Sequence, residues 1–403
     1  MQKCNGTAKW EVAVDHNFLL IGYVRIDLPN IRHCAALAAT VRHGSVSSAA
    51  RAVNLSQPAL TQAIAALESN LDVTLFERSS VGMVPTQPAI LLARRIEIAL
   101  EHIGSTRVTS TQLRAFIAVG RTGSYKSAAQ TLDVKPASVH RAVADLSIAL
   151  GQHLLDKRGR TLFLTAAGQR RLRRFGLAIA ELNAGLAEVA SWQGKARGRI
   201  VIGAMSLSRA RWLPSTLDIF AANYPDVDIV VHEGSHGELI GPLRDGEIDL
   251  LLGALRDVTE IDDLEQEAVF DDHPQIIMRA GHPLLKSAST TQDLRRFSWI
   301  LPGQQTPLRR FWHSMFAQLG IDPPRVQIEC GSVVMIRQLL LSGDSLTLLS
   351  PRQVSIELET GLLSALPAPV SISRTIGITT RIGWRPTREQ QMLLQMLRER
   401  TDG

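Results

Sequence analysis

The chain has 403 residues, too many for one compact domain, so two to three domains are expected. A hydrophobic fraction of 45% with 20% charged residues is ordinary for a folded protein and excludes a disordered or collagen-like chain. No apolar run reaches the ~18 residues that cross a bilayer, and Cys4, Cys34 and Cys330 lack zinc-site or disulfide spacing. We therefore expect a cytoplasmic chain with no membrane segment, no metal and no other cofactor.

The net charge of +6 is distributed unevenly along the chain. Residues 30–195 carry 20 Lys and Arg against 10 Asp and Glu, whereas residues 196–403 carry 21 against 25. A basic half joined to a mildly acidic half suggests a polyanion-binding module attached to a second, different module. Residues 1–27 precede both halves and form an extension for which no motif gives a role.

The basic half contains an internal repeat. Residues 36–50 match residues 115–129, and the repeat offset, which is the spacing from Gly44 to Gly123, stays constant without a gap to Thr86 and Thr165. Apolar positions agree throughout, including Leu67 with Leu146. Two copies of one small domain are therefore expected, over residues 28–88 and 109–168, joined by a short helical segment at 89–108.

The first copy reads as a helix-turn-helix followed by a wing. Apolar spacing predicts a helix over residues 31–43 that stops at Gly44, and a short helix over 47–53. Ser56 is placed to cap a third helix, with Pro58 in its first turn. Two short strands around Gly82 would then form the wing. In the second copy Lys135 stands where Ser56 does, and Ser147 replaces Glu68.

A long amphipathic helix is predicted from Ala166 to about Trp192, within a linker at 169–195. Beyond it, residues 196–403 alternate between strand and helix patterns, which favours parallel sheets with covered faces. The predicted fold class is thus α/β multidomain: two largely α-helical winged helix-turn-helix domains, a linker helix and a two-lobed α/β domain.

Several of these motifs resemble the LysR-type transcriptional regulators. The resemblance rests on Ser56-Gln57-Pro58-Ala59-Leu60-Thr61, on Leu75-Phe76-Glu77-Arg78 and Thr86, and on Leu243-Arg244-Asp245-Gly246 and Gly281-His282-Pro283. It implies that the linker helix pairs with its twin in a dimer, and packing of this helix on its own chain is the alternative. It also implies a periplasmic-binding-protein-like effector domain whose chain crosses between lobes near Phe270 and Pro367. Two helix-turn-helix copies depart from the usual single copy.

Candidate DNA-binding residues follow from groove chemistry. Gln pairs with adenine, Ala or Thr can touch a thymine methyl, and basic wing residues suit phosphates. The candidates are Ser56, Gln57, Pro58, Ala59, Thr61, Gln62, Arg78, Lys135, Ser138, His140, Arg141, Lys157, Arg158 and Arg160.

Candidate effector-binding residues are hydroxyls and neighbouring groups at expected helix starts in the second half, where free N–H groups suit an anion. They are Ser206, Ser208, Ser235, His236, Arg256, Gly303, Thr306 and Ser332. Plain helix capping is the alternative reading for each hydroxyl.

The predicted function is sequence-specific binding of promoter DNA, modulated by a small-molecule effector such as a carboxylate or a sugar. A homodimer or homotetramer is expected, and RNA polymerase is a candidate partner. No catalytic motif supports an enzyme, and an architectural DNA binder would not need the second half. One alternative stays open: one helix-turn-helix copy serves as an oligomerisation or protein-interaction module.

Overall fold

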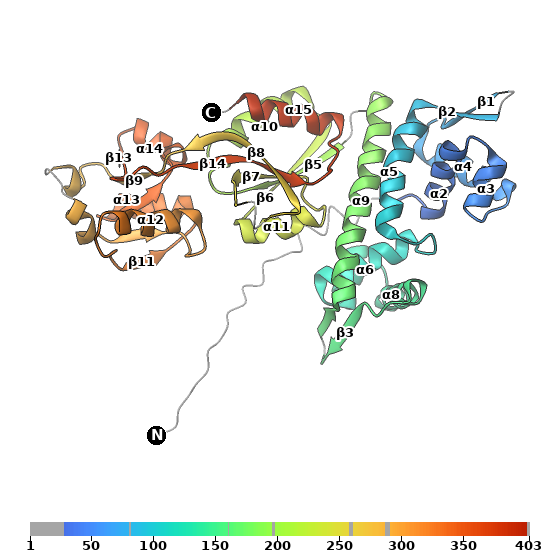
Figure 1. Cartoon of the computed structure of the whole chain (residues 1–403), viewed down its shortest axis with the longest axis horizontal. Coiled ribbons are helices and arrows are strands. Elements are labelled where there is room, and N and C mark those ends of the chain that lie inside the picture. The colour runs from blue at the N-terminus through green and yellow to red at the C-terminus, as the bar shows by residue number, and fades with distance from the viewer. Residues whose placement is uncertain are drawn as a thin grey trace, which may run out of the picture. The chain divides into compact units, whose positions relative to one another are not determined.

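The computed structural model describes residues 28–79, 82–159, 161–195, 198–257, 261–286 and 291–400. It divides into two compact units (Figure 1): unit 1 is residues 1–194 with 245–247, and unit 2 is residues 195–244 with 248–403. Within the described ranges, no helix combines the length and the apolar character needed to cross a bilayer.

The first copy in unit 1 consists of α2 (Ile31–His43), α3 (Val46–Ala52), α4 (Gln57–Leu71), β1 (Phe76–Ser79) and β2 (Gly82–Pro85). α2 ends at Gly44, whose φ of 68° lies in the left-handed region that glycine adopts without strain. The side chains of Ser45 and Ser56 accept hydrogen bonds from the first turns of α3 and α4. These caps confirm the predicted helix starts to within one residue.

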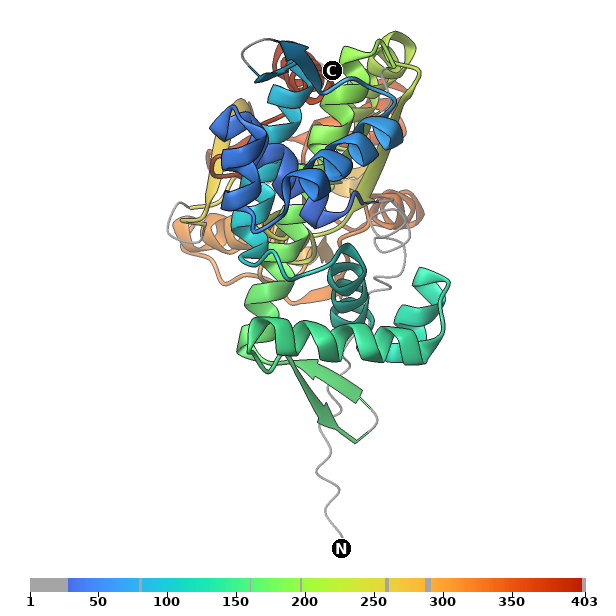
Figure 2. The same ribbon diagram turned by 90° about the vertical axis from the view of Figure 1, so that its right-hand side faces the viewer.

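The second copy repeats this architecture. It consists of α6 (Ser110–Thr122), α7 (Tyr125–Leu132), α8 (Pro136–Leu150), β3 (Leu155–Arg158) and β4 (Thr161–Leu164). Each bound is displaced from its counterpart by the repeat offset, except that α7 extends one position further than α3. The two wings lie at opposite ends of unit 1 (Figure 2).

Each wing leads into a longer helix: α5 (Gln87–Ile103) after the first and α9 (Ala166–Trp192) after the second. The bounds of α9 are the predicted ones. α5 and α9 run side by side through the centre of unit 1 (Figure 1). Their apolar faces join one continuous core that includes both copies.

The first lobe of unit 2 is built on a five-stranded sheet of order β6-β5-β7-β14-β8. Its elements are β5 (Gly198–Ala204), α10 (Trp212–Asn223), β6 (Val227–Glu233), α11 (His236–Arg244), β7 (Leu250–Ala254), β8 (Leu264–Asp272), β14 (Arg374–Arg381) and α15 (Arg388–Glu399). β5, β6 and β7 are parallel, as predicted. The expectation of wholly parallel sheets is wrong for β14, which is antiparallel to both β7 and β8. The chain leaves the lobe after β8 and returns to it in β14, so the direction of β14 is set by this return.

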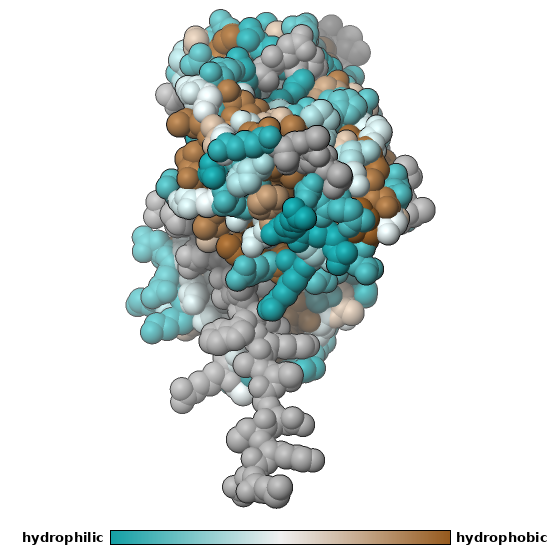
Figure 3. All heavy atoms as spheres, turned by 90° about the vertical axis from the view of Figure 1, so that its left-hand side faces the viewer, coloured by the Kyte–Doolittle hydropathy of each residue, from teal (hydrophilic) through white to brown (hydrophobic). Residues whose placement is uncertain are grey.

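The second lobe contains β9 (Gln275–Arg279), β10 (Trp299–Leu301), α12 (Pro307–Gln318), β11 (Val326–Glu329), α13 (Val333–Ser342), β12 (Thr347–Leu349), α14 (Ser355–Glu359) and β13 (Leu363–Leu366), with short 3-10 helices at Pro283–Leu285, Thr291–Arg296 and Pro351–Val354. The chain enters it between β8 and β9 and leaves it between β13 and β14. Both crossings lie near the predicted ones. The expectation of wholly parallel sheets is also wrong for β9, which is antiparallel to β12 and β13, whereas β10 and β11 are parallel. Figure 3 shows hydrophilic and hydrophobic side chains interspersed on one face of the molecule, as is normal for a surface that meets water.

Candidate DNA-reading helices and effector pocket

α4 is held by its apolar face and presents a polar one. Leu60, Ile64 and Leu67 are buried, whereas Gln57 and Gln62 are exposed. The hydroxyl of Ser56 accepts a hydrogen bond from the backbone N–H of Ala59 at 3.3 Å, which closes the helix start. The exposed first turns can therefore approach base edges while the opposite face stays anchored in the core.

The remaining DNA-binding candidates of the first copy differ in how exposed they are. Thr61 is exposed, and its hydroxyl donates to the carbonyl of Gln57 at 3.0 Å. Pro58 is exposed and Ala59 is half-buried, which allows a methyl contact but also reflects packing. Arg78 belongs to β1, and its side chain lies outside the described part of the chain.

α8 presents a more basic surface than α4. Lys135, Ser138, His140 and Arg141 are all exposed, whereas α4 contains no Lys or Arg. Lys135 stands at the N-cap without a side-chain hydrogen bond to the helix. The His140 ring lies 4.9 Å from the Tyr125 ring, centroid to centroid, which orients it against α7.

The wing of the second copy adds cations. Lys157 and Arg158 are exposed on β3, and the Arg158 guanidinium lies 5.6 Å from the centre of the Phe163 ring. Arg160 lies outside the described residues. The first copy suits reading by polar side chains, and the second adds point charges suited to phosphates.

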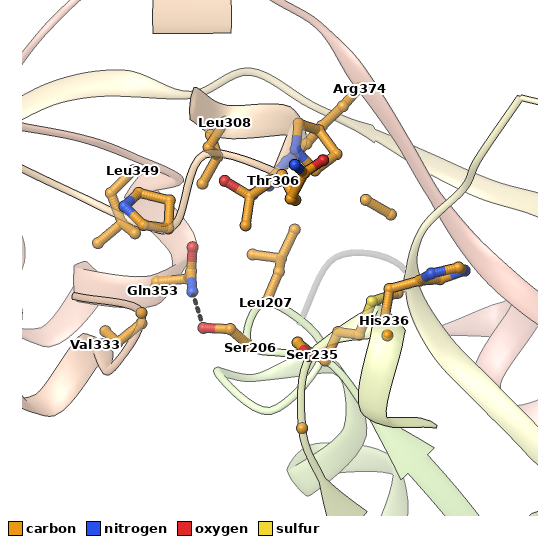
Figure 4. Close-up of a pocket in the computed structure, with 18 of the residues that line it drawn as sticks. Ser206, Leu207, Ser235, His236, Thr306, Leu308, Val333, Leu349, Gln353 and Arg374 are labelled. Carbon is orange, nitrogen blue, oxygen red and sulfur yellow. Dashed lines mark hydrogen bonds between the residues drawn. The ribbon is translucent and has the colours of Figure 1, made fainter. Parts of the chain in front are cut away.

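Unit 2 contains a cavity of about 670 Å³ between its lobes (Figure 4). The first lobe contributes residues that follow β5, β6 and β7, and the second contributes residues that follow β10, β11 and β12. Most of these are the carboxyl ends of parallel strands, where ligands bind in open α/β folds. The Gln353 amide N–H donates to the Ser206 hydroxyl at 2.9 Å and so joins the two lobes across the cavity.

The cavity combines apolar walls with an excess of positive charge. Leu207, Leu308, Val333, Ile336 and Leu349 supply apolar surface. The ionisable Arg and Glu residues in the lining are Arg209, Arg256, Arg310, Arg374 and Glu238. The backbone and hydroxyl of Ser235 donate to the Glu238 carboxylate, which lowers its pKa and keeps it charged. Arg209 pairs with Glu233 and Arg374 with Asp272, and the remaining Arg256 and Arg310 still outnumber Glu238, which favours an anionic ligand.

Arg374 is the most strongly positioned of these cations. Its Nε donates to Asp272 at 2.8 Å, and only 10% of its side chain is exposed. Its Nη2 is also buried and has no hydrogen-bond partner among the described residues. A buried charged donor without a partner is costly unless a ligand satisfies it. Figure 4 shows Arg374 beside the cavity.

Five of the eight predicted effector residues line the cavity. They are Ser206, Ser235, His236, Arg256 and Thr306. The hydroxyl of Ser235 already donates to Glu238 at 2.7 Å, and that of Thr306 donates to the carbonyl of Gly303 at 2.8 Å. These two hydroxyls therefore also serve their own helix starts, in line with the capping alternative.

The other three candidates lie outside the cavity lining. Ser208 is fully buried, and its hydroxyl donates to the carbonyl of Met205 at 2.7 Å. Ser332 caps α13 by accepting from the N–H of Met335 at 3.4 Å. Gly303 contributes a carbonyl to the turn before α12. Ser332 and Gly303 act within their own turns, whereas the Ser208 hydroxyl also donates to the carbonyl of Leu252 on β7 at 3.2 Å, so all three serve the backbone structure.

Sequence reasoning missed Arg374, Gln353, Arg209 and Arg310. Arg374 begins β14, the strand that returns to the first lobe, and is separated from Ser235 by the whole of the second lobe along the chain. Gln353 lies in a short 3-10 helix after β12. Neither Arg374 nor Gln353 lies in a recognisable sequence motif. They reach the cavity only because the chain crosses between the two lobes.

Two family models match this chain. The model described as the bacterial regulatory helix-turn-helix protein, lysR family, matches residues 31–89 and again residues 110–169. The model described as the LysR substrate binding domain matches residues 193–402. Together they cover both copies and the whole of unit 2 up to the last residue but one.

Known proteins agree with these matches. The transcriptional regulator GalR of Pseudomonas putida is 30% identical over 374 residues, which span 89% of this chain and 94% of GalR. PcaQ of Agrobacterium fabrum is 25% identical and covers 73% of this chain and 95% of its own. Among solved structures, a full-length OxyR variant from Pseudomonas aeruginosa shares the fold with a TM-score of 0.55, 20% identity and coverage of 72% and 95%. The chain therefore belongs to the LysR family of transcriptional regulators, proteins with a helix-turn-helix DNA-binding part and an effector-binding part.

Proposed function

We propose that the effector of this regulator is a small organic anion with an apolar body, bound in the cavity of unit 2. The observation that carries this proposal is the buried Nη2 of Arg374, which has no partner among the described residues and lies beside the cavity. Arg256 and Arg310 in the lining add positive potential, and the leucines and valine can cover an apolar body. A carboxylate fits this combination better than a neutral sugar, which would leave the guanidinium charge uncompensated.

The proposed mechanism couples the cavity to DNA. The residues at the start of α4 and α8 contact base edges, and the wing cations contact phosphates. An anion that joins the lobes more tightly than Gln353 and Ser206 do alone favours one arrangement of unit 2. The affinity for the promoter can then change by no more than the ratio of the anion's affinities for the two arrangements of unit 2. We place this activity in the cytoplasm, in a homodimer or homotetramer, with RNA polymerase as a further contact and with no catalytic step.

A thermal-shift screen of the full-length chain tests the effector class. Small carboxylates are compared with their neutral amides and with sugars of similar size. A ligand at ~100 times its Kd should add about 2.7 kcal/mol to the free energy of unfolding. We expect concentration-dependent stabilisation by carboxylates only. Stabilisation by sugars and not by carboxylates would contradict the proposed anion.

Two variants locate the binding site. Arg374→Gln removes the buried donor, and we expect it to abolish the carboxylate shift. Because Arg374→Gln also leaves Asp272 without its ion pair, Arg310→Gln is examined in parallel: Arg310 is exposed and lines the same cavity. Arg400→Ala, at the end of α15, serves as the matched charge control. A carboxylate shift that both cavity variants retain would place the ligand elsewhere.

A further inference from the structure

The two long helices of unit 1 are counterparts that pack antiparallel. α5 begins after Thr86 and α9 after Thr165, the same position in the two copies. Near the start of α9, the Arg174 guanidinium donates to the carbonyls of Glu101 and His102 at the end of α5. Just beyond the end of α9, the Gln193 amide donates to the carbonyl of Leu71, which precedes the first wing. The start of one helix therefore lies beside the end of the other.

Equivalent residues make equivalent contacts across this pair. Arg95 on α5 and Arg174 on α9 are separated by the repeat offset and so occupy the same position in their copies. Arg95 Nη1 donates to Glu181 at 3.0 Å, and Arg174 Nε donates to the carbonyl of His102 at 3.0 Å. His102 and Glu181 are separated by the same offset. Exchanging the two copies maps one contact onto the other, as an approximate twofold axis requires.

The buried face shows the same symmetry. Three equivalent pairs are all buried: Ile96 with Phe175, Ala99 with Ala178, and Ile103 with Leu182. The register that joins residues 95 to 181 and 102 to 174 brings Ala99 opposite Ala178 or its neighbour. Small residues at this central point allow the two helices to approach closely, as at other close helix crossings. The pseudo-axis therefore passes between α5 and α9 inside one chain.

An ion-pair cluster fixes this arrangement. Only 6% of the Arg95 side chain is exposed, and it lies between Glu181 and Glu188, with its Nε 3.1 Å from Glu188. Burial alone would lower the pKa of Arg95, but the hydrogen bond to Glu188 and the charge of Glu181 outweigh burial and raise it. A buried cation held by two carboxylates tolerates little sliding of one helix along the other. The same apolar face of α9 cannot pair with a second chain while α5 covers it.

The two helix-turn-helix copies are joined by the α5–α9 pair and are called heads here. They present different side chains at equivalent positions. In Figure 2 the recognition helices α4 and α8 both lie in front of the α5–α9 pair. Gln62 and Arg141 are equivalent and exposed, but Gln is suited to adenine and Arg to guanine. Thr61 is likewise replaced by His140, and Ser56 by Lys135. Two identical chains paired about a twofold axis present identical heads, whereas the α5–α9 pair of this chain presents two different heads.

We propose that a single chain reads two unlike half-sites of one duplex, with the α5–α9 pair acting as the intramolecular counterpart of an interface between two subunits. The proposal rests on the proposed binding of DNA by both recognition helices. Its partner is a duplex without twofold symmetry, in which one segment is matched to α4 and the other to α8. Any association through unit 2 would bring together pairs of heads, not single heads.

The first test selects duplexes from a random pool with the full-length chain and footprints the selected sequence. We expect two protected segments of different sequence. Gln62→Ala should remove protection of one segment and Arg141→Ala that of the other, each with a loss of affinity of about 5- to 150-fold. Arg400→Ala, which removes a charge from unit 2, should leave both segments protected. A palindromic selected sequence, or an Arg141→Ala footprint equal to that of the parent chain, would overturn the proposal.

The second test asks whether both heads must belong to one chain. Gln62→Ala and Arg141→Ala chains are co-expressed with different tags and purified as mixed assemblies. No chain in the mixture has two intact heads, so we expect affinity to remain at the level of the single variants. Recovery of the parent affinity would overturn the proposal, because it requires heads from separate chains. If the parent chain itself selects no sequence, the proposed DNA-reading function fails instead, which is a different result.

Discussion

Ser56 and Lys135 occupy equivalent positions before the two recognition helices, and only Ser56 closes its helix with a side-chain hydrogen bond. At the start of α8, Pro136 has no N–H and the N–H of Ser138 donates to the carbonyl of Lys135 at 3.0 Å, while the positive charge of Lys135 is unfavourable at the positive end of a helix. We propose that DNA binding offsets this stability cost at Lys135. A DNA phosphate would satisfy both the lysine and the helix start.

Lys135→Ser should therefore stabilise unit 1 and weaken its hold on DNA. A new cap contributes about 0.5–2 kcal/mol to the free energy of unfolding, measured by urea denaturation. The dependence of log affinity on log salt concentration should become shallower by about one, because one phosphate contact is lost. The matched variant Ser56→Ala should lose about 1 kcal/mol and keep its salt dependence. An unchanged salt dependence in Lys135→Ser would contradict the phosphate contact.

Arg95→Met tests the ion-pair cluster that holds α5 against α9. It leaves Glu181 and Glu188 partly buried without their cation, and we expect a loss of about 3–5 kcal/mol. Adding Glu181→Gln and Glu188→Gln should recover much of this loss, because no buried charge is then unpaired. Arg42→Met is the control: 64% of its side chain is exposed where it meets Glu97, and about 1 kcal/mol or less should be lost. Equal losses in both variants would show that the Arg95 cluster is not structural.

Ser206→Ala tests the link between the lobes. The Gln353 Oε1 is buried with no partner among the described residues, so removing the Ser206 hydroxyl leaves the whole amide unsatisfied. We expect a cost of about 1–3 kcal/mol in unit 2 and a weaker response to the effector. Ser208→Ala, which removes a buried hydroxyl outside the cavity, should lower stability without changing the effector response. A change of effector affinity in Ser208→Ala alone would contradict the assigned lining.

Cys34 and Cys330 should differ sharply in reactivity. Burial raises the pKa of Cys34 to about 12, whereas Cys330 is half-buried and lines the cavity. At pH 8 we expect a thiol reagent to label Cys330 but not Cys34, as checked by mass mapping of the labelled peptides. Labelling of Cys34 at the rate of Cys330 in the native chain would contradict its burial.

The same shift predicts a pH dependence of stability. Between pH 9 and 12 the folded chain keeps the Cys34 proton while the unfolded chain loses it, so the free energy of unfolding falls as pH rises. Cys34→Ala should show a smaller fall over this window in denaturation experiments at a series of pH values. An identical fall in both chains would assign the loss to other groups.

The sequence predicts unit 1 well because its signals are local. Gly44 ends α2, Ser56 begins α4, and the uninterrupted stripe around Phe175 and Leu182 defines α9. The packing of α5 against the apolar face of α9 is harder to predict, because the same apolar pattern suits packing against the α9 helix of a second chain equally well. The ion pairs of Arg95 depend on the antiparallel register, which no local pattern encodes.

Less of unit 2 could be predicted from the sequence, because its key contacts join segments that are far apart along the chain. Strands β5 to β7 follow from alternation, but the antiparallel β14 does not, because its pairing depends on where the chain returns to the first lobe. The same return places Arg374 in the cavity. Serine and threonine signals pointed to helix starts near the cavity, yet Ser332 serves its own turn, and Ser208 donates to the carbonyls of Met205 and of Leu252 on β7. Capping and ligand binding use the same residues, so sequence alone does not separate them.

A small anion bound in unit 2 should change the affinity of unit 1 for DNA. The most direct measurement is the affinity of the full-length chain for its selected duplex across a series of concentrations of the stabilising carboxylate, with Arg310→Gln in parallel. We predict a saturable change in the parent chain, an equal change in carboxylate affinity when duplex is added, and a weakened response in the variant. A duplex affinity that stays constant while carboxylate saturates the cavity would contradict this coupling between the cavity and DNA.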